Sequence, residues 1–148
     1  MLQRLSVAAH RILYRVCGGL LCLFAVGCLN SDQVTIAPVV GQVKIDGQPV
    51  VNAIIAFEDP VTGFAAMGRI ETDGKYVLRS QYGNGIPPGE YRVTVSPPPS
   101  RDDQDREIPP VPGATKIPPK FQQGATSGIT ANVEDGENTL DFDLTSSS

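Results

Sequence analysis

The stretch Glu90-Tyr91-Arg92-Val93-Thr94-Val95, residues 90–95, decides the fold prediction, because it alternates polar and apolar side chains without interruption. Tyr91, Val93 and Val95 fall on one face of an extended chain, and the charged or polar residues fall on the other. Strict period-two alternation is typical of a β-strand with one buried face. The sequence therefore predicts a strand here, with the core on the side of Tyr91.

Further runs on both sides of this strand have a similar pattern, at residues 39–45, 51–57, 65–70, 75–78, 130–133 and 139–144. The dipeptides Asp46-Gly47, Asp73-Gly74 and Asp135-Gly136 favour tight turns, because glycine accepts a positive φ angle without penalty. No helical period follows the N-terminal segment. Strand runs separated by turn signals predict an all-β fold, and specifically a β-sandwich.

The alternation also predicts which side chains form the core of this sandwich. Besides the face of Tyr91, the expected inward positions are Val43, Ile45, Ala53, Ile55, Phe57, Tyr76, Leu78, Val133, Leu140, Phe142 and Leu144. The last two runs, 130–133 and 139–144, flank the turn at Asp135-Gly136. We therefore expect these two runs to close the domain as a final hairpin.

The N-terminal segment has the features of a secretory signal. Its first part carries Arg4, Arg11 and Arg15 and no acidic side chain. The apolar run at residues 16–26 is only roughly ten residues long, whereas a membrane-spanning helix needs about twenty. A basic region, a short apolar region and small residues before the cleavage point are the marks of a secretory signal.

Cys28 follows Gly27 at the end of this apolar run, and the sequence then becomes polar. A cysteine directly after a small residue at this place resembles the lipobox of bacterial lipoproteins, although Ala25 stands where that family most often has Leu. The resemblance implies cleavage between Gly27 and Cys28 and acylation of the Cys28 thiol, for example with palmitate. Stable anchoring takes about two acyl chains, which a bacterial lipoprotein has. An ordinary secretory signal or an uncleaved anchor is the alternative.

These signals divide the chain into a signal peptide at 1–27, a tether at 28–38, a sandwich domain at 39–145 and a polar tail at 146–148. About 110 residues remain after the tether, enough for one domain with its own core. Residues 96–123 are rich in proline and interrupt the strand pattern. Loops of this length tend to be functional or disordered. This one could dock a partner as a preformed extended helix, or it could cover one end of the sandwich.

The composition restricts the chemistry of the folded part. The chain has 12 basic and 16 acidic side chains, and three of the basic ones precede Cys28, which leaves a net charge of −7 after cleavage. An acidic surface disfavours nucleic acid, which is bound largely through Lys and Arg. The only histidine, His10, and all three cysteines lie at or before Cys28. This removes the commonest general base, the usual zinc ligands and the Ser-His or Cys-His pairs. We expect no catalytic residue, no metal, no cofactor and no nucleic-acid partner.

Several motifs occur in the order found in a known family. They are Gly41-x-Val43-x-x-Asp46-Gly47-x-Pro49, Ala53-x-Ile55-x-Phe57, Thr72-Asp73-Gly74-Lys75-Tyr76-Val77-Leu78 and Gly89-x-Tyr91-x-Val93-x-Val95. They resemble carboxypeptidase regulatory-like domains, with one residue fewer at the turn in 72–78. The later segments at 117–121 and 126–142 resemble the small lipoproteins of this kind from planctomycete-type bacteria. The resemblance implies a single seven-stranded sandwich of the immunoglobulin or transthyretin-like kind, an extracytoplasmic location and no catalysis. The family has no agreed ligand.

An acidic run inside the proline-rich region has two interpretations. Its carboxylates, which could ligate calcium, belong to Asp102, Asp103, Asp105 and Glu107. The run lacks the glycine-punctuated spacing of a calcium loop, and two arginines interrupt it. We therefore expect a solvated loop.

Two further patterns also have a chemical and a structural interpretation. Tyr91 could be a binding aromatic, but we expect it to pack at a corner with its hydroxyl bonded to the backbone. Lys44 with Asn138 or Asp141 resembles the self-crosslinking pairs of surface adhesins. The glutamate that assists that reaction is absent at the expected place, so we expect no isopeptide bond.

These observations predict a non-catalytic protein that is secreted and held at the bacterial cell envelope, on the outer membrane or the periplasmic face, by its N-terminal lipid. Its sandwich is expected to be an interaction or structural module, with another envelope protein as its partner. The alternative is a carbohydrate-binding module for polysaccharide. The absence of Trp and the shortage of exposed aromatic residues argue against this alternative.

Overall fold

The structure, a computed structural model, describes residues 34–146, so the predictions on Gly27 and Cys28 lie outside the described residues. Within this range the strands are β1 (Val39–Ile45), β2 (Gln48–Pro49), β3 (Ala53–Glu58), β4 (Ala65–Ile70), β5 (Lys75–Val77), β6 (Gly89–Ser96), β7 (Ile129–Val133), β8 (Asn138–Thr139) and β9 (Phe142–Leu144). Two one-turn helices follow β6, namely η1 (Pro119–Gln122) and α2 (Gly124–Ser127). The all-β prediction is confirmed.

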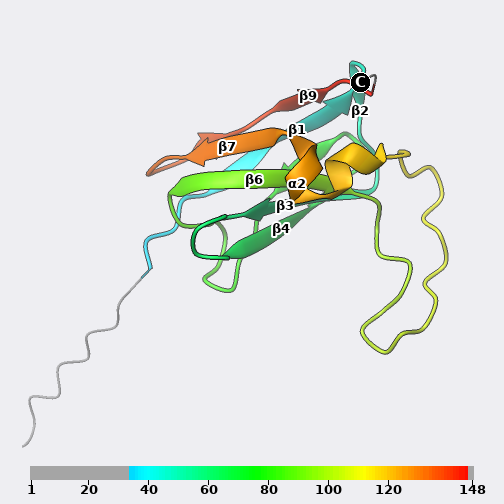
Figure 1. The fold of residues 1–148 in the computed structure, drawn as a ribbon, viewed down its shortest axis with the longest axis horizontal. Coiled ribbons are helices and arrows are strands. Elements are labelled where there is room, and N and C mark those ends of the chain that lie inside the picture. The colour runs from blue at the N-terminus through cyan, green and yellow to red at the C-terminus, as the bar shows by residue number, and fades with distance from the viewer. Residues whose placement is uncertain (1–33, 147–148) are drawn as a thin grey trace, which may run out of the picture. The chain divides into compact units, whose positions relative to one another are not determined.

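The strands form one curled sheet in the order β2-β1-β5-β4-β3-β6-β7, with β8 and β9 both paired to β1. Neighbours along the main path are antiparallel, whereas β8 and β9 run parallel to β1. In Figure 1, β4, β3, β6 and β7 lie side by side in one layer, and β1 and β9 lie in the other. Because β5 pairs with both β1 and β4, it joins the two layers of this sandwich-like fold.

The core lies between these layers and is centred on Phe57 of β3. The Phe57 ring centroid lies 6.0 Å from that of Tyr91, 6.2 Å from that of Tyr76 and 6.1 Å from that of Phe142. These separations are within the range at which aromatic rings attract one another. The predicted core side chains are buried, except that Leu140 and Phe142 are partly buried against the cluster.

The predicted final hairpin is wrong. β7 pairs with β6, whereas β9 crosses to the other layer and pairs with β1. The side chain of Asn138 accounts for this path, since it donates hydrogen bonds to the backbone oxygens of Glu134 and Gly136, both at 2.9 Å. The Asn138 backbone N–H also donates to Pro38 O at 2.9 Å, which starts the pairing with β1. The turn at Asp135-Gly136 is therefore bonded to Asn138 and does not align two hairpin strands.

The packed part of the chain begins before the predicted boundary at Val39. Ala37 is buried, and its backbone N–H donates to Ile86 O at 2.8 Å while the Ile86 N–H donates to Ala37 O at 3.0 Å. The described residues hold nine strands where seven were expected. β2 and β8 are two residues long each, too short for any alternation to reveal them.

The proline-rich region divides into a packed end and a projecting loop. Ile117 and Phe121 are buried in the core, and η1 contacts β6. Thr115 is tied to Val51 in both directions, because its N–H donates to Val51 O at 2.9 Å and its hydroxyl accepts from Val51 N at 2.7 Å. Figure 1 shows the chain between β6 and η1 as a long loop that leaves the strands and returns.

The sequence pattern predicted no helix in this region, and a helix of one turn is too short to show a helical period. Within residues 34–146, no helix has the length and apolar character needed to cross a bilayer.

Candidate functional site

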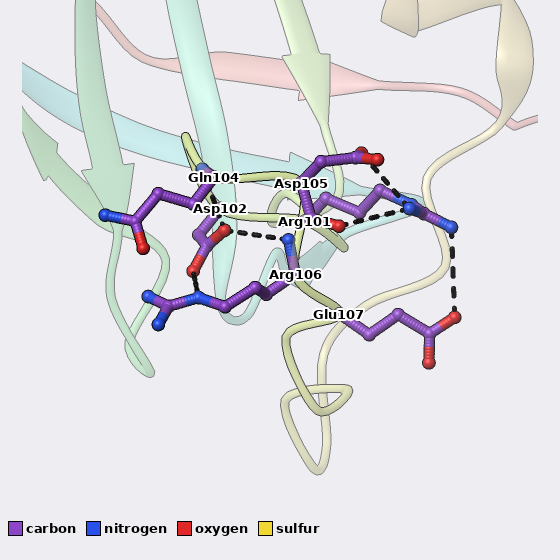
Figure 2. A network of polar contacts seen from close by, with 6 residues as sticks. All are labelled: Arg101, Asp102, Gln104, Asp105, Arg106 and Glu107. Atoms are coloured by element: carbon purple, nitrogen blue, oxygen red, sulfur yellow. Dashed lines mark hydrogen bonds and ion pairs between the residues drawn. The ribbon is translucent and has the colours of Figure 1, made fainter.

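Acidic side chains of the projecting loop form ion pairs with two arginines of the same loop, Arg101 and Arg106 (Figure 2). Asp102 accepts hydrogen bonds from the backbone N–H groups of Gln104 and Arg106, each at 2.9 Å, and from Arg106 Nε at 2.6 Å. The backbone and then the side chain of Arg106 lower the pKa of the Asp102 carboxyl. This carboxylate is therefore charged and already satisfied within its own loop.

Two other acidic side chains of this loop, those of Asp105 and Glu107, lie beside Arg101. Arg101 Nη1 lies 3.1 Å from Asp105 Oδ1, and Arg101 Nη2 lies 3.9 Å from Glu107 Oε1 (Figure 2). Among the described residues, no group of three or more His, Cys, Asp or Glu side chains is arranged to hold a metal ion. The geometry is that of a solvated loop held by surface ion pairs.

The three Asp-Gly pairs are turns, as predicted. The φ angles of Gly47, Gly74 and Gly136 are 74°, 81° and 93°, in the region that favours glycine. Asp46 has a further role, because its carboxylate accepts from the N–H of Ser146 at 3.0 Å and from the Ser146 hydroxyl at 2.5 Å. These bonds lower the pKa of Asp46 and fasten the end of the described chain to the first turn.

Tyr91 has the structural role that the sequence predicted. Its hydroxyl donates to Pro87 O at 2.7 Å, four residues earlier in the chain. Burial raises the pKa of the Tyr91 hydroxyl, and the nearby carboxylate of Asp59 adds to this effect. The ring belongs to the buried core, and its hydroxyl fixes the corner that leads into β6.

The residues that resembled an isopeptide pair also have structural contacts. Asn138 is buried, and its amide bonds to the loop before β8. Asp141 Oδ1 accepts from the backbone N–H of Gln42 at 2.7 Å. Asp141 therefore bonds to the backbone of β1, and Asn138 holds the loop that leads into β8.

A hollow of about 520 Å³ lies at the end of the sandwich where the described chain begins. The residues that define this end hollow are Val34, Asp59, Phe64, Tyr82, Pro87 and Tyr91. The rings of Phe64 and Tyr82 stack with centroids 5.9 Å apart and an angle of 13° between their planes, and Tyr82 is 46% exposed. One face of Tyr82 is thus supported by Phe64, and its ring is accessible to a ligand.

The carboxylate in the end hollow is engaged by its own turn. Asp59 accepts from Val61 N at 2.7 Å, from Thr62 N at 3.1 Å and from the Thr62 hydroxyl at 2.5 Å. These bonds, the one from the hydroxyl first, lower the pKa of Asp59. Stacked aromatic rings thus form part of the lining of the end hollow, and its carboxylate orders the loop between β3 and β4.

A second surface lies on the outer side of β4 and β5. Met67 and Val77 are 64% and 51% exposed, and Arg69 and Arg79 are exposed beside them around a depression of about 410 Å³. These four side chains define what we call the β4–β5 face. Val40 of β1 pairs with Val77 and extends the apolar part, with an exposed fraction of 40%. Five large side chains are thus held outward on paired strands.

Sequence reasoning missed both surfaces. The alternation that places Tyr76 and Leu78 inside also places Val77 and Arg79 outside, so the exposure of these side chains could be predicted from each segment alone. The pairing of β5 with β4 and β1 makes a surface of these residues, and a single sequence does not reveal that pairing. The end hollow likewise depends on loops that meet only after folding.

Comparisons with known proteins add little to this geometry. No family model matches the chain, and no curated protein matches it. Among solved structures, a DUF3823 family protein from Parabacteroides merdae is similar, with 17% sequence identity and a TM-score of 0.40. The match covers 75% of this chain and 46% of that chain, so this chain spans less than half of that protein.

Proposed function

We propose that this chain is a non-catalytic lipoprotein of the bacterial cell envelope, whose sandwich binds another envelope protein. The β4–β5 face is the observation that carries the proposal. Met and Arg are enriched at protein interfaces, and here Met67, Arg69 and Arg79 stand exposed next to Val77. The acidic composition argues against nucleic acid as a partner.

We further propose that the domain is of the carboxypeptidase regulatory-like, transthyretin-like kind. The motif residues that suggested this family have structural tasks in the fold. Gly41 lies against Leu140, Asp46 and Gly47 form the first turn, and Tyr76 and Tyr91 belong to the aromatic core. A motif of scaffold residues supports a family assignment while leaving the ligand open.

The anchor of this proposal is a lipid on Cys28, after cleavage behind Gly27. We expect Cys28→Ser to release the protein from membranes or to leave its signal uncut, because the serine hydroxyl does not take the place of the acylated thiol. Membrane fractionation and the apparent mass of the protein measure both outcomes. Unchanged membrane association and size in this variant would refute the lipid anchor.

Partner binding can be tested in cells with a photo-crosslinking amino acid at Val77. We expect one dominant protein adduct from this position, because Val77 is exposed in the β4–β5 face between Arg69 and Val40. The same probe at Thr130, which is exposed on β7 away from this face, is the matched control and should capture little. Equal capture from both positions, or none from either, would contradict the proposal.

Carbohydrate binding in the end hollow is the second candidate function. The observation that favours it is the exposed ring of Tyr82 stacked on Phe64, since a supported aromatic ring offers a flat apolar surface. We would measure retention on insoluble polysaccharide for the protein and for Tyr82→Ala. Retention that Tyr82→Ala abolishes would shift the function to this site, whereas no retention leaves the β4–β5 face as the binding surface.

A further inference from the structure

We propose that the β4–β5 face recognises an extended acidic segment of the partner protein, with carboxylates on Arg69 and Arg79 and apolar side chains on Met67 and Val77. The inference rests on the proposed function and names the chemistry that this surface recognises.

The pairing register arranges the four side chains of the face as a square. Because Ile70 pairs with Tyr76 and Met67 pairs with Arg79, Arg69 lies opposite Val77. The arginines therefore occupy one diagonal of the square, and the apolar side chains occupy the other.

This square matches the repeat of an extended chain. Diagonal neighbours on a sheet have Cβ atoms about 7–8 Å apart. Side chains on one face of an extended chain repeat every two residues, which is about 6.6–6.8 Å. A partner segment with carboxylates at alternate positions therefore fits the spacing of the two arginines.

The charge of the face also selects for an acidic ligand. In the part of the chain that the structure describes, neither Arg69 nor Arg79 forms an ion pair. Lys75 also lines the depression and contacts Asp73 at 2.9 Å, and Glu71 is the single acidic side chain that lines it. The depression is thus basic on a protein that is acidic as a whole. Guanidinium groups bind carboxylates with two parallel hydrogen bonds, and a basic depression attracts acidic partners from solution.

An anionic membrane is a weaker match to this face than a peptide. Electrostatic binding to lipid headgroups takes clusters of about 4–8 basic residues, and the net negative charge of the chain opposes it. The exposed apolar area of Met67, Val77 and Val40 adds hydrophobic contact that a peptide side chain can fill.

The test uses the full-length protein in a non-ionic detergent and a fluorescein-labelled peptide of about ten residues in which Glu alternates with Val. Fluorescence anisotropy measures binding at about 50 mM and about 300 mM NaCl. We expect binding that weakens with salt and that falls roughly fivefold in Arg69→Gln/Arg79→Gln, the effect of losing two exposed ion pairs. A peptide with Lys in place of Glu should not bind. Met67→Ser should weaken binding of the Glu-Val peptide as well.

The matched control variant, Arg101→Gln/Arg106→Gln, removes the same charge from the projecting loop and should bind as the unchanged protein does. Equal binding of the Glu and Lys peptides, or equal loss in the two double variants, would overturn the inference. Binding to phosphatidylglycerol vesicles in place of the peptide, lost in Arg69→Gln/Arg79→Gln, would overturn it in favour of a lipid surface. If the peptide test fails but the crosslinking probe at Val77 still captures one protein in cells, the proposed function stands and only this inference is refuted. If the probe at Val77 captures no protein, the proposed function itself is refuted.

Discussion

At the scale of single residues, several acidic and amide side chains of this protein bond to backbone groups. Asp59 and Asp102 each accept from two backbone N–H groups, and Asp46 binds the end of the described chain. Tyr76 resembles Tyr91 in this respect, since its hydroxyl donates to Leu140 O at 2.7 Å. The sequence predicted the backbone contact of Tyr91 because its position after a glycine is typical of a corner tyrosine. It did not predict that of Tyr76, whose partner lies 64 residues away.

The Asn138 side chain holds the segment between β7 and β8, so we expect its removal to destabilise the fold. We expect Asn138→Ala to lower the free energy of unfolding by about 2 kcal/mol, because the buried Asn138 side chain bonds to the backbone of Glu134 and Gly136 and the substitution removes all of these hydrogen bonds. Urea unfolding followed by circular dichroism measures the change. Asn132→Ala, at an exposed position of β7, is the control and should change stability by less than about 0.5 kcal/mol. Equal effects of the two substitutions would contradict this role.

At the scale of elements, β1 is the strand on which the two layers depend. It pairs with β2, β5, β8 and β9, so four separate segments meet on it. The sequence predicted the longer strands well, because each carries its own alternation and ends at a turn signal. It failed for the partner of β9, since alternation shows which face a strand buries and not which strand lies beside it.

Gly41 in β1 is the point at which the crossing segment comes closest. A Cβ atom there would lie 1.9 Å from Leu140 O, so the backbone of one of the two segments must shift. We expect Gly41→Ala to destabilise the fold by about 2–3 kcal/mol, in the range of overpacked core substitutions. Thermal unfolding measures it. Gly124→Ala in α2 is the matched control, because its Cβ would meet nothing closer than 3.9 Å, and it should leave the midpoint nearly unchanged. A Gly41→Ala protein as stable as the control would disprove the close approach.

At the scale of the whole molecule, we expect the contacts that order the loops to contribute to the pH dependence of stability. Hydrogen bonds lower the pKa of Asp46, Asp59, Asp73 and Asp102 below the ordinary value of 3.8. The contribution of these carboxylates to the free energy of unfolding is therefore present above about pH 4. It is lost as the pH falls through their lowered pKa values in the folded state. The sequence predicted turns at Asp46 and Asp73, but the acceptor roles of Asp59 and Asp102 depend on local geometry that composition does not show.

The tyrosines of the core limit stability at the alkaline end. Burial raises the pKa of Tyr76 and Tyr91 above the ordinary value of 10.0, so their neutral form stabilises the fold below pH 10 and this contribution is lost as the pH rises further. We expect thermal midpoints measured from about pH 2 to about pH 11 to form a plateau that falls below about pH 4 and above about pH 10. Tyr76→Phe should soften the alkaline fall and leave the acidic one unchanged, because it removes one buried ionisable hydroxyl and no carboxylate. A midpoint that stays constant at both ends, or an acidic fall that Tyr76→Phe abolishes, would show that other groups govern the stability of this sandwich.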